Sequence, residues 1–136
     1  MEYIQLGEQG ELPGIDGLAP FKAVLAIEDI VSRERRHQVS RWLVEMGGIY
    51  VMICGSDCDA WQDSIRKANL EQVPLKEMQP QQFVMITTHL HERLRSVFHH
   101  ARKFARHTHV EADNILTVHV ANRNREVEYH NLFNKR

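Results

Sequence analysis

Four short, mainly apolar runs recur along the chain, and they constrain its fold more than any other feature of the sequence. The runs cover residues 23–27, 49–54, 83–86 and 115–120. A continuous apolar run of this length is typical of a strand that is buried on both faces, as in a parallel sheet. We therefore expect one sheet of four strands.

Helical patterns fill the intervals between these runs. Val39, Trp42, Leu43 and Met46 lie at i, i+3, i+4 and i+7, which is the apolar stripe of an amphipathic helix. Similar stripes follow the second and third runs, and residues 124–136 can form a last helix. The order β-α-β-α-β-α-β-α predicts an α/β fold, a three-layer sandwich around a mostly parallel four-stranded sheet of Rossmann-like or flavodoxin-like type.

The domain limits and the strand order follow from this pattern. Residues 21–136 are expected to form a single α/β domain, since compact domains usually run ~100–150 residues. Doubly wound sheets commonly reverse after the first crossover, so the expected strand order is 49–54, 23–27, 83–86, 115–120. Residues 1–20 are expected to form an irregular arm, because they are rich in glycine and carry only acidic charges: Glu2, Glu8, Glu11 and Asp16.

The segment after the third run carries the strongest helical pattern. Its apolar stripe is expected to comprise Leu90, Leu94, Val97, Phe98, Ala101 and Ala105. Six of the chain's nine histidines lie on or beside this segment. We expect them on a solvated helix face whose positive charge rises below pH ~6.5.

Polar side chains follow each predicted strand. Parallel strands end at the same edge of a sheet, and doubly wound folds bind ligands at that edge. The candidate binding residues there are Glu28, Asp29, Asp57, Asp59, His89, His91 and Glu92. Asn122, Arg123 and Asn124 follow the last run at the same edge.

Four interpretations of this edge remain open. Carboxylates and histidines could hold a divalent metal, although no H-E-x-x-H spacing occurs. Asp57 or Asp59 with His89 could form an acid–base pair, which makes Asp57 and His89 the catalytic candidates. The acidic edge could recognise a basic partner protein. Ser56, Asp57 and Asp59 could simply cap the helix that they precede.

Common catalytic and phosphate-binding motifs are absent from the sequence. The first strand-to-helix turn contains two carboxylates and no glycine, which disfavours a phosphate. Neither G-x-x-x-x-G-K-[ST] nor G-x-S-x-G occurs. Cys54 and Cys58 are spaced neither as a redox pair nor as a zinc knuckle, and Cys58 is expected to be a buried thiol. We therefore expect no cofactor and no metal.

Charge and hydropathy bear on partners and location. Seventeen basic and eighteen acidic residues leave a net charge of −1, which argues against nucleic acid as a partner. No apolar run approaches the ~20 residues that span a membrane, and the N-terminal segment does not have the pattern of a signal peptide. With only two cysteines, a cytoplasmic protein is the simplest expectation.

Four segments carry a family resemblance. Residues 40–45 (SRWLVE), 55–61 (GSDCDAW), 68–71 (ANLE) and 83–88 (FVMITT) together resemble a small bacterial α/β family of unassigned function. The resemblance covers about residues 21–121 and implies a bacterial origin and a single domain. It carries no activity, so no catalytic residue is transferred from it.

These observations favour a bacterial cytosolic protein-binding domain. The most concrete version is an immunity-type protein that neutralises a toxin by direct binding. The carboxylates of the edge would face a basic partner, and Trp61 would add an aromatic anchor if it is exposed. The alternative is a small enzyme or ligand-binding domain with an acidic and histidine site at the strand ends. Either a monomer or a homodimer is expected.

Overall fold

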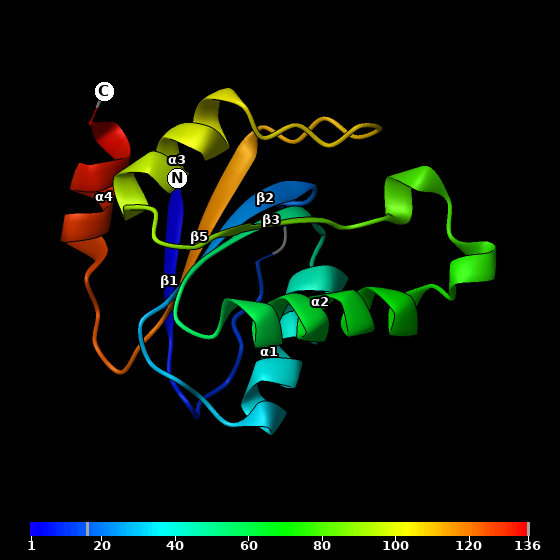
Figure 1. Ribbon diagram of the computed structural model, residues 1–136, viewed down its shortest axis with the longest axis horizontal. Coiled ribbons are helices and arrows are strands. Elements are labelled where there is room, and N and C mark those ends of the chain that lie inside the picture. Colours follow the sequence, from blue (N-terminus) through cyan, green and yellow to red (C-terminus); the bar gives the residue numbers. More distant parts are fainter. Residues whose placement is uncertain (16, 136) are drawn as a thin grey trace.

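A single parallel sheet of five strands forms the middle layer of the molecule (Figure 1). The computed structural model describes residues 1–15 and 17–135, so Asp16 of the predicted arm lies outside the described residues. The strands are β1 (Glu2–Leu6), β2 (Phe21–Ile27), β3 (Gly48–Gly55), β4 (Met85–His89) and β5 (Asn114–Val120). Helices cover both faces, which confirms the predicted three-layer α/β sandwich.

Strand β1 is the element that the sequence pattern does not predict. It pairs in parallel with β5, so that Glu2 lies beside Leu116 and Leu6 beside Val120. The expectation of an irregular arm is therefore wrong for residues 2–6. An edge strand is covered on fewer sides than a central one, and only Leu6 in β1 is fully buried, so its apolar pattern is weak.

The predicted strand order is wrong as well. The observed order is β1-β5-β2-β3-β4, which places β4 beside β3 and β5 on the other side of β2. The chain therefore winds outward through two crossovers before it reverses. The first two helices lie side by side on one face, where the hydroxyls of Ser40 and Ser64 are 2.8 Å apart. This contact between small side chains joins residues far apart in sequence, and no local pattern indicates it.

The helices divide equally between the two faces. Helices α1 (Arg33–Glu45) and α2 (Cys58–Gln72) pack on one face, and α3 (Leu94–Lys103) and α4 (Glu126–Asn134) on the other (Figure 1). Ser32 caps α1, because its hydroxyl accepts a hydrogen bond from the backbone N–H of Arg35. Residues 74–83, between α2 and β4, contain two short 3₁₀ turns (Leu75–Glu77 and Pro80–Gln82).

Helix α3 is shorter than its sequence pattern predicts. It begins at Leu94 and ends at Lys103, whereas Leu90 lies before it and is 54% exposed. His91 adopts a left-handed backbone conformation with φ 62°, which ends any helix running from residue 90. Leu90 is therefore not part of the buried stripe, while Val97, Phe98 and Ala101 are.

The segment that joins β1 to β2 packs against α1. The buried guanidinium of Arg35 donates hydrogen bonds to the carbonyls of Gly7 and Gly10 at 2.8 and 3.0 Å. The indole N–H of Trp42 donates to the carbonyl of Pro13 at 2.8 Å. Glu8 accepts hydrogen bonds from the backbone N–H and the hydroxyl of Ser32, each at 2.6 Å. These contacts fasten the connection next to the turn that leads from β2 into α1.

Candidate functional site

The winding of the sheet reverses between β2 and β5. β3 and β4 lie on one side of β2, and β5 lies on its other side. In open α/β sheets a crevice forms outside the carboxyl ends of the strands at such a point. Glu28 and Asp29 follow β2 there, and residues 121–125 follow β5.

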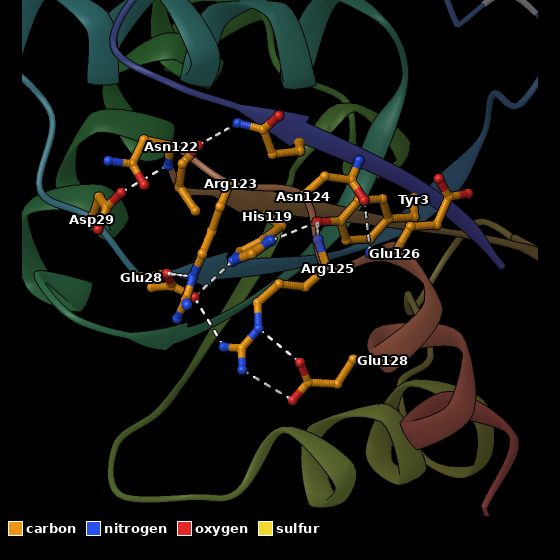
Figure 2. Close-up of polar contacts among 12 residues, drawn as sticks. Tyr3, Glu28, Asp29, His119, Asn122, Arg123, Asn124, Arg125, Glu126 and Glu128 are labelled. Atoms are coloured by element: carbon orange, nitrogen blue, oxygen red, sulfur yellow. Dashed lines mark hydrogen bonds and ion pairs between the residues drawn. The ribbon is translucent and has the colours of Figure 1, made fainter.

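Glu28 is the centre of a polar network at this point (Figure 2). One carboxylate oxygen accepts from Nε2 of His119 at 3.1 Å and from the guanidinium of Arg125 at 3.2 Å. The other accepts from Nε of Arg123 at 2.8 Å. The hydrogen bond from Arg123, with those from His119 and Arg125, lowers the pKa of Glu28 to about 2. Glu28 therefore stays ionised and forms ion pairs with two arginines of the same chain.

His119 lies behind Glu28 and is fully buried. The backbone N–H of Arg125 donates to the Tyr3 hydroxyl at 2.9 Å, which leaves the phenolic hydrogen free to donate to Nδ1 of His119 at 2.6 Å. Nε2 then carries the imidazole hydrogen and donates it to Glu28. Burial lowers the pKa of His119, so its neutral form is favoured. Both ring nitrogens are thus engaged within the protein.

Further contacts fix the loop that follows β5. Asp29 accepts a hydrogen bond from the backbone N–H of Asn122 at 2.8 Å, and Gln5 donates to the carbonyl of Ala121. Arg125 also forms an ion pair with Glu128 at 2.7 Å. We call Tyr3, Glu28, His119, Arg123, Arg125 and Glu128 the carboxyl-edge network. A polar network in which each member has a partner makes a site rigid.

Asp57 and Asp59 lie at the start of α2. Asp57 is the N-cap residue, with a left-handed φ of 57°, and its side chain makes no capping hydrogen bond. Instead it forms an ion pair with Arg36 at 3.4 Å. The interpretation of Asp57 as a side-chain cap is therefore wrong. Asp59 lies in the first turn, where the helix dipole favours a carboxylate.

His89 and Glu92 form a separate pair at the end of β4. Nδ1 of His89 lies 2.9 Å from the Glu92 carboxylate, and Nε2 lies 2.7 Å from the Thr87 hydroxyl. The His89 ring is 5.1 Å from that of His100 of α3. Among the described residues, Asp57 and His89 share no hydrogen bond or ion pair. The structure therefore gives the two catalytic candidates different partners, and His91 projects from the exposed turn that follows.

Trp61 cannot act as a surface anchor. Its side chain is fully buried in the core between α2 and the sheet. The expectation that it contributes to a binding surface is wrong, because its spacing on the α2 stripe reflects core packing.

Both cysteines are buried free thiols, as expected for Cys58. Burial raises the pKa of Cys54 to about 12. Burial also raises the pKa of Cys58, and the carboxylates of Asp59 and Asp57 add to this effect.

Slow thiol chemistry follows from this burial. We expect a disulfide reagent at pH 8 to label the folded protein at least about tenfold more slowly than the urea-unfolded chain, because the thiolate is the reactive form. Absorbance at 412 nm after addition of Ellman's reagent measures both rates. Fast labelling of the folded protein would contradict the burial of these thiols.

The concavity beside the carboxyl-edge network is small. Its volume is about 180 Å³, and its lining includes Glu28, Cys54, Glu92 and Tyr129. Small-molecule sites usually have volumes of about 300–1,000 Å³. Within residues 1–15 and 17–135 there is no group of three or more His, Cys, Asp or Glu side chains placed to hold a metal ion. No helix in that part of the chain is long and apolar enough to cross a membrane.

The sequence pattern places Glu28 and Asp29 at the site but does not indicate three other members of the carboxyl-edge network. His119 lies inside an apolar run, Tyr3 lies in a strand that was not predicted, and Arg125 lies just before the last helix. A histidine within a strand otherwise fit for complete burial was the available signal, because a buried imidazole needs hydrogen-bond partners.

Comparisons with known proteins bear on the family alone. Curated proteins and solved structures gave no match to this chain. A family model described as "Domain of unknown function (DUF7684)" matches residues 1–136, a longer stretch than the resemblance over residues 21–121 suggested. The chain therefore belongs to this family of unknown function.

Proposed function

We propose that this protein is a protein-binding domain that holds its partner at the carboxyl edge of the sheet. The most concrete form is an immunity-type protein of the bacterial cytoplasm that neutralises a toxin by direct binding. The observation that carries the proposal is an exposed aliphatic side chain, Ile30, on a turn that is fastened at both ends.

The turn between β2 and α1 comprises residues 28–32. At its start, the backbone N–H groups of Glu28 and Asp29 donate to the carbonyl of Val120 at 2.9 and 3.0 Å. At its end, Ser32 donates to Glu8. Ile30 lies between these anchors and is 74% exposed. A side chain presented on a rigid turn loses little conformational entropy when a partner covers it.

Charged groups surround this turn without a large excess of either sign. Glu28 is neutralised by Arg123 and Arg125, and the Arg123 side chain is 60% exposed. Arginine is enriched at protein interfaces because its guanidinium both stacks and hydrogen bonds. The surface that the partner would meet is therefore mixed in charge, with an apolar centre at Ile30, rather than purely acidic.

The enzyme alternative has less support from the geometry. Both nitrogens of His119 and both of His89 are held by partners within the protein, so neither imidazole has a nitrogen free for a substrate. The adjacent concavity of about 180 Å³ is also small for a substrate. A surface that is rigid and shallow suits a macromolecular partner better.

The Ile30→Asp variant tests this proposal. Cross-linked pull-downs from the native host, quantified by mass spectrometry, should recover the partner at least about tenfold less well than with the unchanged protein. The control is Leu75→Asp, which introduces the same charge at a position that is 72% exposed and lies between α2 and β4. Equal recovery with both variants would contradict binding at the carboxyl edge.

An immunity-type function makes a further prediction, which concerns growth of the host. Growth of a host that expresses the toxin-like product of a neighbouring gene should depend on this protein. Protection should be lost with Ile30→Asp and kept with Leu75→Asp. A host that grows equally well without the protein would rule out the immunity role while leaving partner binding to the pull-down experiment.

A further inference from the structure

A larger concavity, of about 550 Å³, lies at the amino ends of β2 and β5, opposite the carboxyl ends of the strands. It is placed by the start of β2, the start of β5 and the end of α3, since Lys22 pairs in register with Ile115 and both line it. Its volume is in the range of small-molecule sites. We call it the amino-edge cleft. A ligand bound there would be independent of the proposed partner at the carboxyl edge.

Lys22 is the most buried charged group in the lining, with 6% exposure. Its ammonium donates to the carbonyls of Ala101 and Ala105 at 2.5 and 3.3 Å, which offsets the negative end of α3. An ammonium has three N–H donors, and the third has no partner in the described part of the chain. One hydrogen bond donor of Lys22 is therefore still available.

Two arginines share this cleft with Lys22. Nε of Arg102 is buried and has no hydrogen-bond partner in the part of the chain that the structure describes. Arg106 makes a single long hydrogen bond, 3.5 Å, to the carbonyl of Ala105. Within residues 1–15 and 17–135, none of the three cations forms an ion pair within 4.0 Å. Nη2 of Arg102 donates to the carbonyl of Lys135 at 3.1 Å, and its Nη1 has no hydrogen-bond partner in the described part of the chain, so Nη1 is the donor that a ligand would engage.

Two carboxylates and an apolar wall complete the lining. Glu111 and Asp113 lie on the segment before β5, so the cleft has three cations and two carboxylates, besides His107. Val110 and Ile115 contribute apolar surface to the same cleft. The excess of positive charge is small, which suits an anion of low charge with an apolar part.

We propose that the amino-edge cleft binds a small organic oxyanion. Its phosphate or carboxylate group accepts hydrogen bonds from Lys22, Arg102 and Arg106, and its apolar part packs against Val110 and Ile115. Guanidinium groups match the planar spacing of carboxylate and phosphate oxygens. The burial that lowers the pKa of Lys22 would be offset by the bound negative charge.

Phenyl phosphate, benzoate and phenol are suitable probes. Titrations of the ¹⁵N-labelled full chain, followed by two-dimensional NMR, should show saturable shifts of residues 105–115 with at least one of the two anions and none with neutral phenol. The comparison of phenyl phosphate with benzoate decides which oxyanion the cleft prefers. Failure of both anions, or equal shifts with phenol, would overturn the proposal.

Three variants make the test specific. Arg106→Gln, at an exposed position, should weaken binding of the preferred anion about tenfold, because a charge-assisted hydrogen bond is lost. Lys103→Gln, an exposed neighbour that does not line the cleft, should change binding by less than about twofold. Asp113→Asn should strengthen binding, because it removes a repulsive carboxylate from the lining. Equal losses for Arg106→Gln and Lys103→Gln would show unspecific attraction and would contradict a site.

Discussion

Replacing Gly55 with alanine is expected to lower the free energy of unfolding by about 3 kcal/mol, since backbone strain and overpacking act together. Gly55 ends β3 with φ 94°, a left-handed conformation that L-residues rarely adopt. A Cβ at this position would overlap the carbonyl oxygen of Ile27. That oxygen already accepts the backbone N–H of Ser56 at 2.9 Å, so it cannot move away freely.

The control for this variant is Gly14→Ala. A Cβ built on Gly14 meets nothing within 4 Å, so the change in stability should stay within about 0.5 kcal/mol. Urea denaturation followed by circular dichroism measures both variants. Equal stability of Gly55→Ala and Gly14→Ala would contradict the close approach of β3 and β2 at the carboxyl edge.

Glu28→Gln is expected to cost about 2 kcal/mol of stability at pH 7. The shift of the Glu28 pKa to about 2 would correspond to ~3 kcal/mol by linkage. The smaller value allows for solvent screening, because the Glu28 side chain is 26% exposed. Glu128→Gln is the control: it removes a carboxylate that also pairs with Arg125 but is 50% exposed, and it should cost less than about 0.5 kcal/mol.

The stability difference between the unchanged protein and Glu28→Gln should decrease as the pH falls. The unfolded chain protonates Glu28 near its ordinary pKa of 4.5, while the folded chain keeps it ionised down to about pH 2. The contribution of Glu28 is therefore complete above pH 4.5 and is lost as the pH falls toward 2. Urea denaturation curves at several pH values should show the difference between the unchanged protein and Glu28→Gln shrinking through this interval. A difference that does not change with pH would contradict the role of the ionised carboxylate.

His119 also makes the protein less stable as the pH falls, but in a higher pH range than Glu28 does. Its pKa is lowered in the folded protein, so below its ordinary pKa of 6.5 the unfolded chain takes up a proton that the folded chain does not. The unchanged protein should therefore begin to lose stability as the pH falls below 6.5, before Glu28 contributes to the loss.

The three-layer fold could be predicted because short local sequence patterns indicate its main strands and helices. Residues 23–27 and 49–54 indicate buried strands in any context, and the stripe of Val39, Trp42 and Leu43 indicates a helix. The strand order depends instead on which helices share a face. Helices α1 and α2 share a face and meet at Ser40 and Ser64, 24 positions apart, and no local pattern indicates this contact.

The candidate site could be predicted only in part, for a related reason. Glu28 and Asp29 directly follow a strand, so topology alone brings them to the carboxyl edge. The partners that set the protonation of Glu28 come from β5 and the loop beyond it, more than 90 positions away. The sequence predicts an acidic edge. In the structure, Arg123 and Arg125 neutralise Glu28, the carboxylate at the point where the winding of the sheet reverses.

The pairing of β1 with β5 also constrains how the protein folds during synthesis. β2, β3 and β4 can align with α1 and α2 as each emerges from the ribosome, but β1 has only β5 as a neighbouring strand. Residues 2–6 must therefore wait, unpaired, until residues 114–120 have been translated. The hydrogen bond of Tyr3 to His119 likewise forms only after β5 has been made.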